Sequence, residues 1–219
     1  MDKKHVVESV EGRRGRLCAL GDEIWGYAET AFVEHQSMAA LCKALAAEGF
    51  TVEEGIGNVP TAFKGTFGSG SPVIGFLGEY DALFGLDQRA GCTEKVSDNP
   101  GAPGHGCGHN LLGVGALAAA FALKDYLVAN KCPGTVIFFG TPGEEGGSGK
   151  AFMAREGCFN GLDAALTWHP STTTAVSNHS SLANIQARFR FSGVSSHAAG
   201  APHIGPTPPA PAEPPVSST

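Results

Sequence analysis

The stretch that decides the fold lies between residues 111 and 139. It reads LLGVGALAAAFALKDYLV at 111–128 and continues into TVIFF at 135–139. Residues 111–128 are apolar nearly all round, which is typical of a helix buried against a sheet. Residues 135–139 are typical of a central strand, and VIGFL at 73–77 lacks polar alternation, as a strand covered on both faces does. A buried helix between two such strands predicts an α/β fold.

The sequence on either side extends this pattern. Two amphipathic stretches near the N-terminus predict helices, one from His5 to Tyr27 and one from Ser37 to Glu48. Ser37 is expected to cap the second helix and Gly49 to end it. Further runs predict strands at 50–53, 61–66 and 164–168 and a helix at 148–156 that ends at Gly157. This alternation predicts a mostly parallel sheet flanked by helices, with a ligand site at the carboxyl ends of its strands.

The C-terminal part of the chain has a different character. Residues 183–191 alternate between apolar and polar side chains, which predicts a strand of a second sheet that is solvated on one side. We therefore expect a domain boundary near Ser180. Six of the 14 prolines fall in the last 15 residues, so the segment 206–219 is expected to form a disordered, proline-rich tail.

Composition excludes several classes of protein. Of the 219 residues, 42% are hydrophobic and 16% charged, which is typical of a globular chain. The formal charge of −6 and the absence of a basic stripe argue against a nucleic-acid partner. The apolar run at 111–123 is shorter than the ~20 residues of a membrane span, and no secretory signal precedes the fold, so we expect a cytoplasmic protein without a membrane partner. Six irregularly spaced cysteines do not suggest a disulfide framework.

Ligand-type side chains follow the predicted strands. The loop GHGCGHN at 104–110 carries His105, Cys107 and His109 at alternate positions, which would project to one side of an extended chain. Imidazole and thiolate groups are preferred ligands of zinc and similar metals, so the loop resembles a metal cradle. The alternative is a glycine-rich connection with a surface histidine and a buried cysteine.

The next two strand ends carry similar chemistry. Glu144 and Glu145 are adjacent in the turn TPGEEGG at 141–147, so one can bind a metal while the other acts as a general base. The alternative is a pair of solvated acids at a helix N-terminus. His169 follows the strand at 164–168 and is a further candidate ligand. Three successive strand ends with such residues favour one shared site.

These motifs carry a resemblance to a known family. The segments GHGCGHNLLG (104–113), GTPGEEGGSGK (140–150), DAALTWHP (163–170) and FSGVSSHAAGAPHIG (191–205) occur in order. Together they resemble the amidohydrolase branch of the aminoacylase and carboxypeptidase-G type zinc metallopeptidases. The resemblance runs from about residue 5 to residue 205. It implies that 1–180 is the N-terminal part of a catalytic domain and that 181–205 begins an α+β lid and dimerisation domain.

The resemblance also implies the roles of individual residues. Cys107, His109, Glu145 and His169 correspond to ligands of one or two divalent ions, zinc or manganese. Glu144 corresponds to the general base. His197 corresponds to a lid histidine that crosses a dimer interface and holds the developing oxyanion.

The chain departs from the family pattern at three places. Glu79-Tyr80-Asp81 stands where many relatives carry a metal-binding histidine two residues before an aspartate. Glu79 is therefore an open question as a ligand, whereas Asp81 fits the role of orienting a ligand. Asn110 stands where related amidohydrolases often have aspartate. After Gly205 the family continues into the rest of the lid and a last metal ligand, so we expect a truncated or frame-shifted chain that is marginally stable.

The expected function is that of a metal-dependent amidohydrolase acting on a small amide. The resemblance implies N-acyl amino acids as substrates, with p-aminobenzoyl-glutamate-like amides or related dipeptides as the specific expectation. It also implies a homodimer, or a heterodimer with a related subunit, formed through the lid. Two alternatives stay open: a non-catalytic truncated remnant or subunit of such an enzyme, and a dinucleotide-binding domain. The second is weak because Gly113 and Gly115 lie inside the predicted helix.

Overall fold

The computed structural model describes residues 3–176 together with 180, 182, 183 and 185. The chain divides into two units, 1–175 and 176–219, and the architecture below is that of the first. The strand predicted at 183–191, His197, and the tail predicted at 206–219 lie wholly or largely outside the described residues. The domain boundaries therefore stay predictions.

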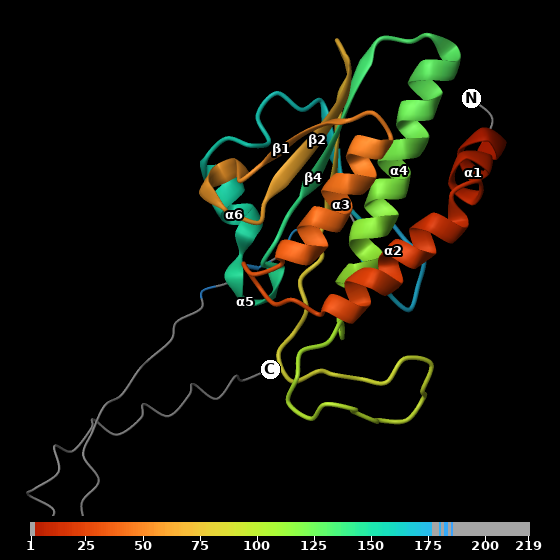
Figure 1. The fold of residues 1–219 in the computed structure, drawn as a ribbon. Helices are drawn as coiled ribbons and strands as arrows, with labels where there is room; N and C mark the ends of the chain where they lie inside the picture. The colour runs from red at the N-terminus through yellow and green to blue at the C-terminus, as the bar shows by residue number, and fades with distance from the viewer. Residues whose placement is uncertain (1–2, 177–179, 181, 184, 186–219) are drawn as a thin grey trace, which may run out of the picture. The chain divides into compact units, whose positions relative to one another are not determined.

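Five strands form a single sheet at the centre of the unit (Figure 1). In the order β1-β2-β4-β3-β5 they are β1 (Thr51–Glu54), β2 (Phe63–Ser69), β4 (Gly134–Gly140), β3 (Val73–Gly78) and β5 (Ala164–Leu166). β3 pairs in parallel with β4 and β5, while β2 is antiparallel to both β1 and β4. The predicted α/β fold is confirmed. The sheet is mixed, however, because β2 runs opposite to the other four strands. In the strand order, β4 lies between β2 and β3.

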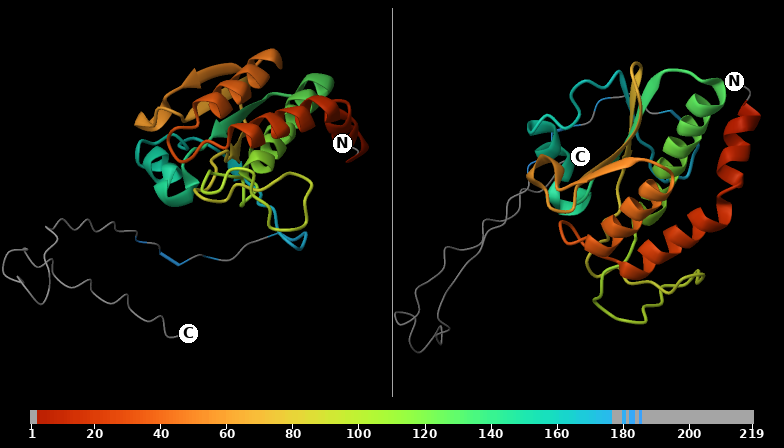
Figure 2. Two further views of the ribbon diagram at one scale, coloured as in Figure 1. Left: turned by 60° about the horizontal axis from the view of Figure 1, so that its bottom comes forward. Right: turned by 45° about the horizontal axis from the view of Figure 1, so that its top comes forward.

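Four helices lie on one face of the sheet (Figure 2). They are α1 (Lys3–Glu11), α2 (Arg14–Tyr27), α3 (His35–Ala47) and α4 (His109–Asn130). The single helix predicted from His5 to Tyr27 is wrong, since the chain leaves helical geometry at Gly12 and Arg13. Ser37 is not the cap of α3, which begins two residues earlier. The hydroxyl of Ser37 instead donates a hydrogen bond to the Glu29 carboxylate at 2.9 Å. The predicted end of this helix at Gly49, which has φ +84°, is confirmed.

The core divides at β4 because side chains alternate across a strand. Val136 and Phe138 belong to the core beneath the four helices. Phe139 and Ile137 pack on the opposite face with residues such as Met153 of α6 (Gly149–Arg155). A sheet covered on both faces explains why the central strands are apolar without alternation.

Helix α4 is the central helix of this unit. It has 22 residues, so it extends beyond the apolar run that predicted it, and by length and composition alone it could cross a membrane. Its buried residues pack against β3 and β4 and against α1 and α2, which is the environment of a core helix. A Cβ on Gly113 would lie 2.6 Å from the Glu79 carbonyl oxygen. Glycine at this position therefore lets the first turns of α4 approach the end of β3 closely.

An ionic network ties the helices together. Arg13, at the break between α1 and α2, donates to Glu48 at 2.9 Å and to Asp125 of α4 at 2.7 Å. Lys124 donates to the same Glu48 carboxylate at 2.7 Å. Hydrogen bonds from Arg13, reinforced by Lys124, outweigh burial and lower the pKa of Glu48 from 4.5 to about 2.

Glu48→Gln is therefore expected to destabilise the chain by ~1–3 kcal/mol at neutral pH. Because the folded-state pKa lies below the unfolded-state value, the stabilisation is present above pH 4.5 and is lost as the pH falls toward 2. Urea denaturation between pH 7 and pH 3 should show the two stability curves converging. Glu53→Gln, which breaks an exposed pair with Lys64, is the matched control and should change stability by less than ~1 kcal/mol. A constant gap for Glu48→Gln across this pH range would contradict the prediction.

Candidate active site

His109 is the centre of the candidate site. It is the first residue of α4, its side chain is fully buried, and both ring nitrogens face carboxylates. Nδ1 lies 2.9 Å from Asp81 Oδ1, and Nε2 lies 2.9 Å from Glu79 Oε2. Glu79 and Asp81 directly follow β3, so the close approach of α4 to that strand end creates the contact. Asp81 thus stands where an orienting partner of His109 is expected.

Charged groups of opposite sign lie in contact around His109. Burial disfavours the imidazolium form, but the hydrogen bond to Asp81 and the nearby Glu79 carboxylate outweigh it and raise the pKa of His109 to about 10. Burial likewise opposes ionisation of Glu79, yet contacts with His109 and Lys150 lower the pKa of this carboxyl to about 2. The Lys150 ammonium pairs directly with Glu79 Oε1. The buried carboxylates therefore give this region a high affinity for positive charge.

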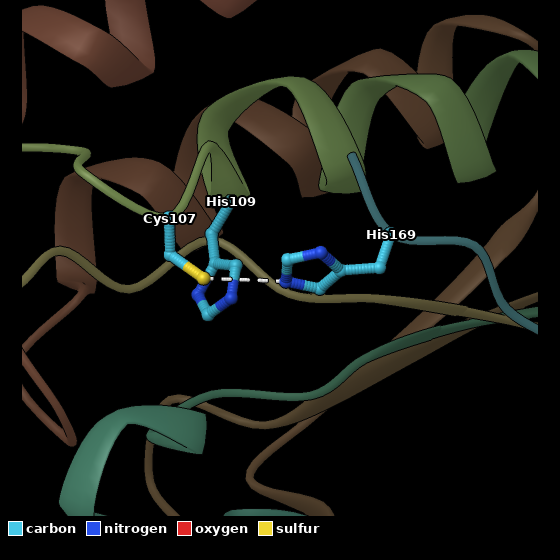
Figure 3. Close-up of side chains that lie close together, drawn as sticks. All are labelled: Cys107, His109 and His169. Carbon is cyan, nitrogen blue, oxygen red and sulfur yellow. Dashed lines mark hydrogen bonds between the residues drawn. The ribbon is translucent and has the colours of Figure 1, made fainter. Parts of the chain in front are cut away.

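Cys107 and His169 complete one side of the site (Figure 3). Cys107 Sγ lies 3.2 Å from His169 Nε2, and the His109 and His169 rings meet edge to face with centroids 5.7 Å apart. His169 Nδ1 donates to the Pro170 carbonyl at 2.9 Å, which leaves Nε2 as the acceptor facing the thiol. Trp168 places this segment, because its indole N–H donates to the Leu112 carbonyl of α4 at 3.1 Å.

Glu144 and Glu145 lie in the turn that follows β4, which we call the double-acid turn (residues 143–147). Glu144 Oε2 lies 3.9 Å from His109 Nε2. The backbone N–H of Glu145 donates to Asp81 Oδ2 at 2.8 Å. One aspartate therefore orients both the buried histidine and this turn.

The two acids have different surroundings. Burial, together with the charges of Glu79 and Glu145, raises the pKa of Glu144, as suits a group that accepts a proton. Burial and a hydrogen bond with the Glu145 side chain raise the pKa of the Cys107 thiol to about 11. Glu145 thus lies near Cys107 but belongs to neither group of donor atoms that converge within 4.8 Å, whereas Glu144 converges with Glu79 and His109.

The donor atoms fit a divalent cation. Cys107, His109 and His169 offer atoms within 4.8 Å of one another, and so do Glu79, His109 and Glu144. Glu79 Oε2 and His109 Nε2 are buried without a hydrogen bond of acceptable geometry in the described part of the chain. A thiol and two imidazoles are donors that zinc-like ions prefer.

The prediction that three alternating side chains form a metal cradle is wrong for His105. His105 is buried elsewhere, with Nε2 3.1 Å from the Ile24 carbonyl and its ring near Trp25. The loop is not extended, because turns form at Gly106 and at Gly108, which has φ +79°. These turns rotate His105 away from Cys107. Asn110 also points away from the site, since its Nδ2 donates to the Gly21 carbonyl at 3.2 Å.

Two residues of the site carried no signal in the sequence. Lys150 lies in the quoted motif at 140–150, but only the fold brings its ammonium to Glu79. Glu34 is a fully buried carboxylate that binds the backbone of the double-acid turn from more than 100 positions earlier in the chain. An acid beside a predicted helix start ordinarily indicates a dipole effect, so its spacing does not reveal this contact.

A protein-family comparison identifies the class to which this fold and site belong. The model of peptidase family M20/M25/M40 matches residues 75–200, which is more than half of the chain. The chain belongs to this family.

Comparison with curated proteins shows which members of the family this chain is similar to. The chain is 52% identical over 202 residues to one of the subunits of the p-aminobenzoyl-glutamate hydrolase of Escherichia coli K12, covering 92% of this chain and 42% of that protein. Within the amidohydrolase branch, the four motifs predict a similarity to this protein, which the identity confirms. The chain is 32% identical over 216 residues to mouse Xaa-Arg dipeptidase, covering 93% and 46%. It thus spans about half the length of the curated relatives that it matches.

Solved structures support the fold. A dinuclear metal binding peptidase of the M20 family from Bacillus subtilis superposes with a TM-score of 0.63 at 21% identity, over 74% of this chain and 44% of that one. The aminobenzoyl-glutamate utilization protein of Klebsiella pneumoniae gives a TM-score of 0.56 at 17% identity, over 76% and 46%. At these identities the likeness concerns the fold alone.

Proposed function

We propose that this chain provides the metal ligands and the general base of a metal-dependent amidohydrolase, which releases an amino acid from its N-acyl form. The observation that carries the proposal is the convergence of Cys107, His109 and His169 donor atoms within 4.8 Å, with Glu144 beside His109. Membership of the M20/M25/M40 family supports the same reaction class.

The cation would be held by Cys107, His109 and His169, with Glu145 beside the thiol as a further ligand. One or two divalent ions, zinc or manganese, would polarise the amide carbonyl and acidify the attacking water. Asp81 holds the His109 ring at Nδ1 and so directs Nε2 toward Glu79 and Glu144. Lys150 balances the charge of Glu79, which lies beside His109.

Proton transfer is assigned to Glu144. Its side chain is 46% exposed, so it reaches both water and the buried His109. The carboxylate takes a proton from the attacking water and later delivers it to the leaving amine. His197 of a partner lid stabilises the oxyanion, which makes the active form a homodimer or a heterodimer with a related subunit.

The substrate proposed is p-aminobenzoyl-glutamate or a closely related amide. The 52% identity to the E. coli hydrolase polypeptide supports this choice over a dipeptide, since the dipeptidase is 32% identical. A cytoplasmic location is proposed with it. The six cysteines are all free in the structure, which suits a reducing compartment.

The test uses this chain for metal binding and a chimera for turnover. In the chimera, residues 1–200 are followed by the part of the E. coli polypeptide that this chain does not match. We expect the chimera to release p-aminobenzoate from p-aminobenzoyl-glutamate, to lose activity to a chelator, and to regain it with zinc or manganese. A folded, metal-loaded chimera without amidase activity on N-acyl amino acids would contradict the proposal.

Cys107→Ser probes the metal centre in the chain itself. Exchanging a thiolate for a poor ligand should lower zinc stoichiometry at limiting metal. Cys132→Ser, which changes an exposed cysteine elsewhere, is the matched control and should bind metal as the wild type does. Equal stoichiometry in all three proteins would overturn the assignment of Cys107.

A further inference from the structure

Three buried carboxylates hold the double-acid turn and Lys150, which lies three residues beyond it. Glu34 Oε1 accepts the Gly143 N–H at 2.8 Å, and Asp81 Oδ2 accepts the Glu145 N–H at 2.8 Å. Glu79 pairs with the Lys150 ammonium just beyond the turn. Asp81 and Glu79 already belong to the site around His109. Glu34, in contrast, comes from the loop before α3 and contacts no candidate metal ligand directly.

Glu34 is held firmly in this position. Its residue has no exposed surface, and its second oxygen, Oε2, accepts the Thr61 hydroxyl at 2.8 Å. Burial raises the pKa of Glu34, and hydrogen bonds with its own backbone and Thr61 oppose that change. Burying a carboxylate is costly unless its oxygens are satisfied, so both of these contacts matter to the fold.

The neighbouring Phe32 shapes the seat of the turn. It has φ +67°, and its ring lies against the glycines of the turn. A Cβ on Gly143 would come within 2.7 Å of this ring, and one on Gly147 within 2.6 Å. The three-residue segment 32–34 therefore supplies both a surface for the turn and the acceptor that anchors its first N–H.

We infer that Glu34 is a positioning residue: its carboxylate fixes the Gly143 backbone so that the Glu144 and Glu145 side chains reach the site around His109. Gly143 has φ +64° and directly precedes Glu144, so rotation of its peptide would swing both acids. The inference rests on the proposed function, in which these two acids are base and ligand. It extends the site to a residue far away in the sequence.

Three substitutions separate the charge of Glu34 from its reach. Glu34→Ala removes the acceptor, and Glu34→Asp keeps the charge but withdraws it by one methylene. Glu34→Gln keeps an oxygen for the Gly143 N–H, and its amide N–H₂ can donate to the Thr61 hydroxyl. The matched control is Glu29→Ala. Glu29 also binds backbone N–H groups, those of Gln36 and Ser37 at the start of α3, without touching the turn.

Two measurements on this chain test the inference. Amide hydrogen exchange reports on the Gly143 N–H, and zinc titration reports on metal affinity. Urea denaturation gives the folded fraction of each variant, and the zinc affinity is corrected for it. We expect Glu34→Ala and Glu34→Asp to speed Gly143 exchange by ~10-fold or more and to weaken zinc binding by ~10- to 100-fold. Glu34→Gln should stay close to wild type in both. Glu29→Ala should lose stability while Gly143 exchange within the folded state and zinc affinity remain unchanged.

The outcomes distinguish this inference from the proposed function. Zinc affinity in Glu34→Asp equal to that in Glu29→Ala would overturn the positioning role, provided that Glu145→Ala weakens zinc binding. If Glu145→Ala binds zinc as the wild type does, the ligand assignment has failed instead. Gly143 exchange then decides alone, and wild-type exchange in Glu34→Asp overturns the inference. Should Glu34→Ala fail to fold, Glu34→Asp carries the comparison.

Discussion

Replacement of Glu144 by alanine in the chimera is expected to lower kcat by ~100- to 10,000-fold while metal stays bound, because proton transfer in the transition state contributes an effect of that size. Glu145→Ala should lose activity and metal together. The difference follows from their positions, since Glu145 lies beside the Cys107 thiol and Glu144 is partly exposed to water. Steady-state kinetics and metal analysis of the same protein samples provide the measurement.

Glu144→Gln is the matched variant for this prediction. It keeps the size of the side chain but cannot accept a proton as the carboxylate does, so it should resemble Glu144→Ala in rate. The opposite assignment has a physical basis, because Glu144, Glu79 and His109 donor atoms also lie within 4.8 Å of one another. Loss of metal in Glu144→Ala with retention in Glu145→Ala would show that base and ligand are exchanged.

Replacement of His197 by alanine should lower kcat by ~100- to 1,000-fold with little change in metal content. A donor to the oxyanion acts only as charge develops in the transition state, which separates its effect from that of a ligand. His197 lies outside the described residues, so the prediction depends on the family resemblance in the segment 191–205. The measurement compares kcat and KM in the chimera.

Mixing of subunits tests whether His197 acts across a dimer interface. A hybrid of His197→Ala and Glu144→Ala subunits has one site with an intact base and an intact lid histidine. In a two-fold dimer, random exchange of equal amounts should restore about a quarter of the wild-type activity. An inactive mixture, with exchange of subunits demonstrated separately, would show that His197 serves its own subunit or has no catalytic role.

The sequence predicted the parts of the fold that depend on local pattern. The apolar helix at 111–128 and the central strands are where periodicity places them, because burial on both faces leaves a clear composition. The break at Gly12 and Arg13 was missed, since amphipathic character continues through it. There, a long-range contact from Arg13 to Glu48 and Asp125 accompanies the change in direction. Such a contact leaves no local periodic signal.

The candidate site divides in the same way. Local sequence patterns predict that ligand-type residues follow three successive strands, and strand direction then brings Cys107, Glu144 and His169 to one end of the sheet. No sequence pattern predicts that His105 turns away or that Glu34 anchors the double-acid turn, because both depend on tertiary packing. Residue spacing reports on the path of a single segment. The turns at Gly106 and Gly108, and a hydrogen bond across more than 100 residues, depend on how separate segments pack.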